Sequence, residues 1–204
     1  CSSDLLETAR KEARARVDLD EALRAQLNAP FSLVEYGNAA GGKVDALARL
    51  AKQQGVALEP AVFTGFPQQT ADMTEPSLLW AELAFLEDLL TTAINAKVAT
   101  IHSVAAPLPL TNTPPANGGR PLVELPLQIE LTGQVQNVGR FLQTLPLRAL
   151  EIHNAGLPEA PTNKPALFID RVVLRKQSPD KPDDVRLSLR RSEEHTSELQ
   201  SPYV

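Results

Sequence analysis

The segment that comes nearest to a chemical motif is GNAAGGKV, from Gly37 to Val44. It fits the phosphate-binding pattern G-x-x-x-x-G-K-[ST] at every position except the last, where that pattern requires a hydroxyl that holds Mg²⁺. Val44 has no hydroxyl, although the apolar stretch from Phe31 to Tyr36 precedes the glycines as a strand would. We favour a flexible glycine-rich hinge here. A small nucleotide- or phosphate-binding domain that uses Gly37 to Val44 is the alternative function.

The other residue types with catalytic potential form no recognisable site. His102 and His153 lie in no metal-binding spacing such as HExxH, and no serine lies in the G-x-S-x-G frame of a hydrolase. Glu82, Glu87 and Asp88 fall on one predicted helix, where we expect a solvated face rather than an acid/base pair. The sequence therefore predicts no catalytic residue, no metal ligand and no cofactor, and it indicates a protein that is not an enzyme.

The last residues of the chain differ in character from the rest. Arg191 to Ser201 reads RSEEHTSELQS, which resembles the in-frame translation of a sequencing adapter. Segments of this kind are excluded from fold reasoning. We therefore expect residues 191–204 to be a non-native tail without packed structure, and the native sequence to be interrupted after Arg190.

The first residue has two explanations. Cys1 is the only cysteine, which excludes an internal disulfide and a multi-cysteine metal site. Cys1-Ser2-Ser3 fits either the lipidated end of a mature lipoprotein or the truncation of a longer chain. We favour truncation, since the other end of the sequence also looks interrupted, and the chain would then be a fragment.

Charge and hydropathy exclude two classes of partner contact. The net charge of the 204 residues is −5, and it becomes −3 without the tail, which carries one basic and three acidic residues. That balance offers no basic footprint for nucleic acid. No apolar run approaches the length of about 20 residues that spans a bilayer. A hydrophobic fraction of 43% is enough for one packed domain with an appendage.

The N-terminal part is predicted to be helical. From Asp4 to Asn28, small and apolar residues recur at helical spacing between many charges, and Asp20 interrupts the stripe. A narrow stripe is typical of a stalk or coiled coil over residues 1–30, and a helix docked on the body is the alternative. Residues 31–55 should then form the hinge and a helix from Lys43 to about Gln54, which Gly55 ends.

From residue 56 to 190 the pattern predicts one α+β domain. In chain order we expect strand Val56–Thr64, helix Glu75–Ala96, strands Val98–Ala105 and Leu122–Thr132, helix Val135–Leu145, a short strand at Leu150–His153, strand Leu167–Lys176 and an extra strand Val185–Leu189. Apart from the short and the extra strand, this order is that of the ferredoxin-like, split βαβ fold, with two helices on one face of an antiparallel sheet.

The best strand also predicts the core. Leu127, Ile129 and Leu131 alternate with polar residues, so one face of the strand should be buried. We expect these side chains to face Leu83, Leu86, Leu90, Phe141 and Leu142. Pro126 lacks a backbone N–H and indicates an edge or a bulge.

Three segments of the domain resemble the PilO-like family of pilus proteins. LPLQIELTGQVQNVGRFLQTLPL, from Leu125 to Leu147, is similar to the signature of that family, an alternating strand followed by a helix with Gly-Arg-Phe-Leu. LFIDRVVLRKQ and VRLSLR are similar to its closing hairpin. The helix from Glu75 to Lys97 resembles that of a pilus-like branch. The resemblance covers roughly residues 40 to 190.

The resemblance implies a structural role in the bacterial cell envelope. Such proteins have one membrane helix, a coiled coil and a ferredoxin-like domain, and they serve type IV pilus-like or secretion-type assemblies by dimerisation or pairing. We therefore expect a non-catalytic interaction protein whose partner is a second copy or a PilN-like paralogue. A missing N-terminal segment would anchor it to a membrane, and its place would be periplasmic or outer-membrane-associated.

Overall fold

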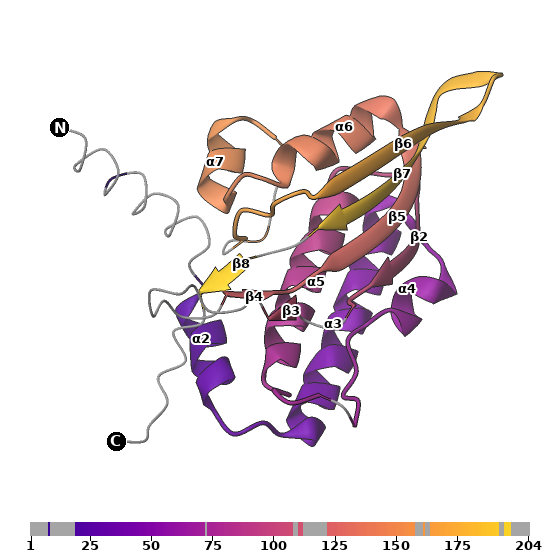
Figure 1. The fold of residues 1–204 in the computed structure, drawn as a ribbon. Coiled ribbons are helices and arrows are strands. Elements are labelled where there is room, and N and C mark those ends of the chain that lie inside the picture. Colours follow the sequence, from indigo (N-terminus) through magenta and orange to yellow (C-terminus); the bar gives the residue numbers. More distant parts are fainter. Residues whose placement is uncertain are drawn as a thin grey trace.

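The computed structural model describes Thr8 and residues 19–71, 73–107, 110–111, 122–157, 161, 164–191 and 194–196 (Figure 1). Its helices are α2 (Glu21–Asn28), α3 (Leu33–Gln54), α4 (Pro60–Thr64), α5 (Leu78–Asn95), α6 (Val135–Thr144) and α7 (Ala149–Asn154). Its strands are β1 (Ala57–Leu58), β2 (Thr100–Ala105), β3 (Leu110–Thr111), β4 (Leu122–Glu124), β5 (Leu127–Gln134), β6 (Arg171–Ser178), β7 (Lys181–Arg191) and β8 (Glu194–Thr196).

Five of the strands form one sheet in the order β1-β2-β5-β7-β6. β1 runs parallel to β2, and the other neighbours are antiparallel, so the sheet is mixed. The predicted ferredoxin-like α+β fold is confirmed. β7, which contains the extra strand predicted at Val185–Leu189, lies inside the sheet and pairs on both sides, and β6 forms the edge. The β6–β7 hairpin extends beyond the helices (Figure 1).

α5 is the centre of the core because its sequence, LLWAELAFLEDLLTTAIN, is apolar around most of its circumference. A helix of this kind must be covered on more than one side. α2 and α3 pack on it, and α6 packs on it and on β5 and β7. Leu79, Leu83, Phe85, Leu86 and Leu90 are all at most 1% exposed. The helices therefore share one core with the inner face of the sheet.

The sheet has one buried face and one polar face. Leu127, Ile129 and Leu131 of β5 are at most 2% exposed, and Phe141 of α6 is fully buried, as the alternation predicts. Leu142 is only half-buried at the margin of the core. The residues between them, such as Gln128, point to the opposite face. The predicted phase of the strand is confirmed.

The N-terminal helix is not continuous to Asn28. Leu19 and Asp20 are not helical, and the Asp20 side chain accepts a hydrogen bond from the N–H of Ala22, which begins α2 as a new helix. α2 packs against α5 and buries Leu23. This part of the expected stalk is therefore a docked helix, the alternative that the narrow stripe left open. Apart from Thr8, which is helical, residues 1–18 lie outside the described part.

The glycine-rich segment is neither a hinge nor a phosphate-binding loop. α3 runs from Leu33 to Gln54 straight through Gly37, Gly41 and Gly42. Ser32 begins the helix by accepting a hydrogen bond from the N–H of Glu35, and Gly55, with φ of 71°, ends it as predicted. The glycines weaken the helix, but packing on α5 outweighs propensity. The hinge prediction and the nucleotide-binding alternative both fail here, since helical N–H groups are already bonded.

Two predicted strands are replaced by helices. Of the strand expected from Val56 to Thr64, only Ala57–Leu58 pair with β2, and Pro60 then begins α4. Leu150–His153 lies in α7, where Ile152 is buried and Leu150 is 76% exposed. Short apolar runs do not distinguish a strand from one helical turn, and tertiary packing decided both segments.

The strand expected from Leu122 to Thr132 is divided at Leu125 and Pro126 into β4 and β5. β4 joins a small sheet in the order β3-β4-β8. β8 is Glu194–Thr196, and Arg191 is the last residue of β7, so the expectation of an unpacked tail is wrong for these residues. The remaining tail lies outside the described residues. Its foreign origin stays a prediction.

A buried lysine holds the segment that leads into β6. Lys164 is 2% exposed, and its Nζ donates to the carbonyl oxygens of Leu145, Leu147 and Pro165 at 2.9, 2.7 and 3.0 Å. The N–H of Leu167 also donates to the Leu145 oxygen. These bonds satisfy carbonyl groups beyond the end of α6 and fix the course of the chain before the edge strand.

Replacement of Ile129 by alanine tests the strand phase. Ile129 is 2% exposed, so Ile129→Ala should lower the free energy of unfolding by about 2–5 kcal/mol, measured by chemical denaturation. Gln128→Ala, on the polar face, is the control and should change it little. Equal losses from the two changes would show that the assigned faces are wrong.

Gly41→Ala tests the helical state of the glycine-rich segment. An added Cβ would meet nothing within 4 Å, and alanine favours a helix, so the variant should gain about 0.5–1 kcal/mol of unfolding free energy. Gly55→Ala is the matched control and should lose stability, because its φ of 71° strains any residue with a Cβ. A loss at Gly41 as well would contradict the continuous α3.

Candidate functional site

The polar face of the sheet joins a carboxylate, an imidazole and a hydroxyl in one row. The Nδ1 of His102 lies 2.7 Å from an oxygen of Glu59, and its Nε2 lies 3.0 Å from the Oγ1 of Thr132. His102 lies at a register shift in β2, between the pairs that Ile101 and Ser103 form with β5, and a bulge can re-aim a side chain in this way. Sequence spacing gave no sign of the row, because its three members come from distant segments.

The order of these groups is that of a catalytic triad, but the setting does not support catalysis. Thr132 lies within β5, between β2 and β7, so the neighbouring N–H groups serve the sheet ladder and cannot form an oxyanion hole. The Glu59 side chain is 50% exposed. The row is therefore a cross-strand polar network that joins the Glu59 segment, β2 and β5 on the wet face. His153, the other histidine considered in the sequence analysis, is exposed in α7, far along the chain from this row.

The same face becomes basic towards the edge of the sheet. Arg186 of β7 donates to Glu130 of β5 at 2.6 Å, and this hydrogen bond holds the pKa of Glu130 below its usual value. In the register of β6 and β7, Arg175 lies opposite Arg186 and Arg171 lies opposite Arg190. Directly opposed like charges destabilise a sheet, so this pattern is not explained by stability of the strand pair.

β6 is the long free edge of the sheet. It has eight residues, and among the described strands only β7 pairs with it. At the other edge, β1 has two residues, and α4 follows it and packs on β2. A free edge presents a row of N–H and C=O groups that can pair with another strand. β6 is therefore the candidate interaction site of the fold.

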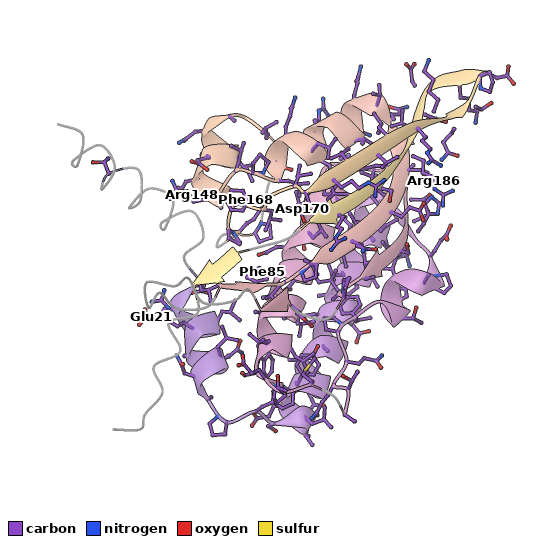
Figure 2. All side chains as sticks on the ribbon, in the orientation of Figure 1. Glu21, Phe85, Arg148, Phe168, Asp170 and Arg186 are labelled. Carbon is purple, nitrogen blue, oxygen red and sulfur yellow. The ribbon has the colours of Figure 1, made fainter. Side chains whose placement is uncertain are left out.

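The helix-side surface of β6 is apolar and uncovered. Val172 and Leu174 lie opposite the buried Leu189 and Leu187, yet they are 42% and 48% exposed, since α6 packs on β5 and β7. The preceding Phe168 and Ile169 are exposed as well. Figure 2 places Phe168 and Asp170 at one end of this edge and Arg186 towards the other. Exposed apolar side chains that gather along one strand edge are typical of an interaction site.

The lysine of the apparent phosphate motif has a structural role. Lys43 of α3 forms an ion pair with Glu87 of α5, beside a hollow of about 260 Å³ that is lined by α2, α3 and α5. The amine is therefore already neutralised by a carboxylate and ties the two helices together. A phosphate-binding loop needs a lysine amine that contacts the phosphate, and in this structure the amine contacts Glu87 instead.

Glu82 of α5 is a buried acid that the sequence did not predict. We expected a solvated side chain, but Glu82 is 3% exposed, and burial raises its pKa to about 7. The charge of Glu82 in turn raises the pKa of the nearby Tyr36, after the larger effect of burial. The Tyr36 hydroxyl donates to the Pro67 oxygen at 2.7 Å, and its ring packs edge-on against Trp80.

The stability of the protein should fall as pH rises, because of Glu82. Its folded-state pKa is raised from 4.5 to about 7, so the folded state binds the proton more tightly, and stability present below pH 4.5 is lost as pH rises through about 7. Glu82→Gln should therefore stabilise the protein at alkaline pH by at most about 3 kcal/mol and have a smaller effect in acid. Thermal unfolding across pH measures this. The exposed Glu75→Gln is the control, and parallel curves for the two variants would contradict the assignment.

Two further features of the described residues bear on function. No group of three histidine, cysteine, aspartate or glutamate side chains within these ranges could hold a metal ion. In the same ranges, no helix is long and apolar enough to cross a membrane.

Comparison with known proteins identifies the fold. No family model and no curated protein match the sequence. Three solved structures from Akkermansia muciniphila, pilus-like in type, do match.

A core domain has a TM-score of 0.63 at 17% identity, over 93% of this chain and 98% of that one. A second structure has a TM-score of 0.60 at 15% identity and covers both chains fully. A third, without its transmembrane region, has a TM-score of 0.62 at 14% identity, over 95% and 98%. The chain shares the fold of these proteins.

Proposed function

We propose that this chain is a non-catalytic structural protein of a pilus-like assembly in the bacterial cell envelope, and that it works by pairing with another protein. The observation that carries the proposal is the free edge of β6, flanked by exposed apolar side chains, in a fold shared with pilus-like proteins. A PilO-like role, with a PilN-like paralogue or a second copy as the partner, is part of the same proposal.

The position relative to a membrane is also proposed. One of the neighbours was solved without a transmembrane region, so that protein has one. A membrane segment before residue 1 would hold this domain at the periplasmic or outer-membrane surface. The charged N-terminal segment would then continue as a coiled coil towards the membrane, and α2 would be its docked end.

A photo-crosslinking residue at position 172 of the full-length protein tests the pairing. In native envelopes, this site should give an adduct with a partner, because Val172 lies on the uncovered side of β6. The same residue at position 34 is the matched control, since Val34 is 73% exposed but lies on α3. A full-length protein that sediments as a monomer at all concentrations, with no adduct from position 172, would contradict the proposal.

A further inference from the structure

The two faces of β6 differ in chemistry. Its sequence is RVVLRKQS, with Val172 and Leu174 on the helix side and Arg171, Val173 and Arg175 on the polar side. Each face continues the chemistry of β7, where leucines lie beside Val172 and Leu174 and arginines lie beside Arg171 and Arg175. A strand that pairs with β6 would therefore contact an apolar surface on one face and guanidinium groups on the other.

Three arginines of this edge form no ion pair with a described residue. Arg186 is bonded to Glu130, but Arg171, Arg175 and Arg190 have no acidic partner among the described residues. They lie exposed in a chain whose net charge is −5. An acidic side chain on an added strand would lie directly opposite an arginine, with the two Cβ atoms about 5 Å apart, within reach of a carboxylate–guanidinium pair.

A second copy of β6 does not fit this edge. The strand carries Arg171, Arg175 and Lys176 and has no acidic residue, so self-pairing would bring two strands of the same positive charge together. Charged residues on an edge strand are a known protection against self-association. The edge is thus open to a strand of opposite charge and closed to its own.

We infer that the β6 edge accepts an extended segment of a different protein in which acidic and apolar residues alternate. The matching pattern is acidic, apolar, small, apolar, acidic. Its two acids lie opposite Arg171 and Arg175, its central residue lies opposite Val173, and its two apolar residues extend the surface of Val172 and Leu174. The pattern reads the same in both directions, so parallel and antiparallel addition are both possible.

This inference rests on the proposed pairing function and names the chemistry of the partner. Main-chain bonds to the edge supply binding without sequence preference, and the two faces supply the selection. The arginine pairs are exposed, so their contribution weakens as salt rises. Binding driven by the apolar residues does not weaken in this way.

Peptide binding to the full chain tests the inference. The probe is a labelled peptide with the central sequence Glu-Val-Thr-Val-Glu, and its controls are a scrambled Glu-Glu-Thr-Val-Val and a reversed-charge Lys-Val-Thr-Val-Lys. Fluorescence anisotropy should show the alternating acidic peptide binding about tenfold more tightly than the scrambled one, with the difference reduced at high salt. The lysine peptide should not bind measurably.

A charge swap makes the test specific to the edge. Arg171→Glu with Arg175→Glu should exchange the preference, so that the lysine peptide binds and the acidic peptide does not. The matched control is Arg49→Glu with Lys52→Glu, which makes the same charge change at exposed positions of α3 and should leave the preference intact. Circular dichroism of both variants confirms folding.

The outcomes separate this inference from the proposed function. Equal affinity for the alternating and scrambled peptides, or no exchange of preference in the charge swap, overturns the recognition pattern. Self-association that the charge swap abolishes assigns the edge to a second copy and also overturns it. If position 172 still gives an adduct in envelopes in these cases, the pairing function stands without the pattern.

Discussion

The structure depends on the burial of α5. This helix is apolar on nearly every side, so the sheet and α6 must cover one part of it and α2 and α3 the other. That requirement explains why α3 stays helical through three glycines and why Lys43 of α3 pairs with Glu87 of α5. It also explains why Glu82 is buried at a cost in stability. The elements that cover α5 remove this carboxylate from water.

The same helical layer leaves the edge of the sheet uncovered. α6 has ten residues and packs on β5 and β7, while β6 lies beyond it with half-exposed Val172 and Leu174. Lys164 holds the chain in place just before this strand, so the edge is presented by a fixed segment. An edge that is long and amphipathic is suited to pairing, whereas the other edge is too short to serve.

The polar face shows how strand register can place three polar groups in the order of a catalytic triad. The row of Glu59, His102 and Thr132 has the distances and order of a triad, yet its hydroxyl lies in a central strand whose backbone N–H groups serve the sheet ladder. In a sheet, the register of neighbouring strands brings polar side chains of one face together, and these side chains form hydrogen bonds with one another. Towards β6 the register opposes arginine to arginine instead, and that mismatch distinguishes the edge from the rest of the face.

Local patterns in the sequence determined the phase of β5, the amphipathic α6, the long α5, the β6–β7 hairpin and the end of α3 at Gly55. Each of these depends on periodicity or a single conformational preference, which a linear sequence displays. The state of the glycine-rich segment, the helical α7, the buried Glu82 and the outer place of β6 were decided only by tertiary packing. Packing can outweigh propensity, and strand order depends on contacts between segments that are distant in sequence.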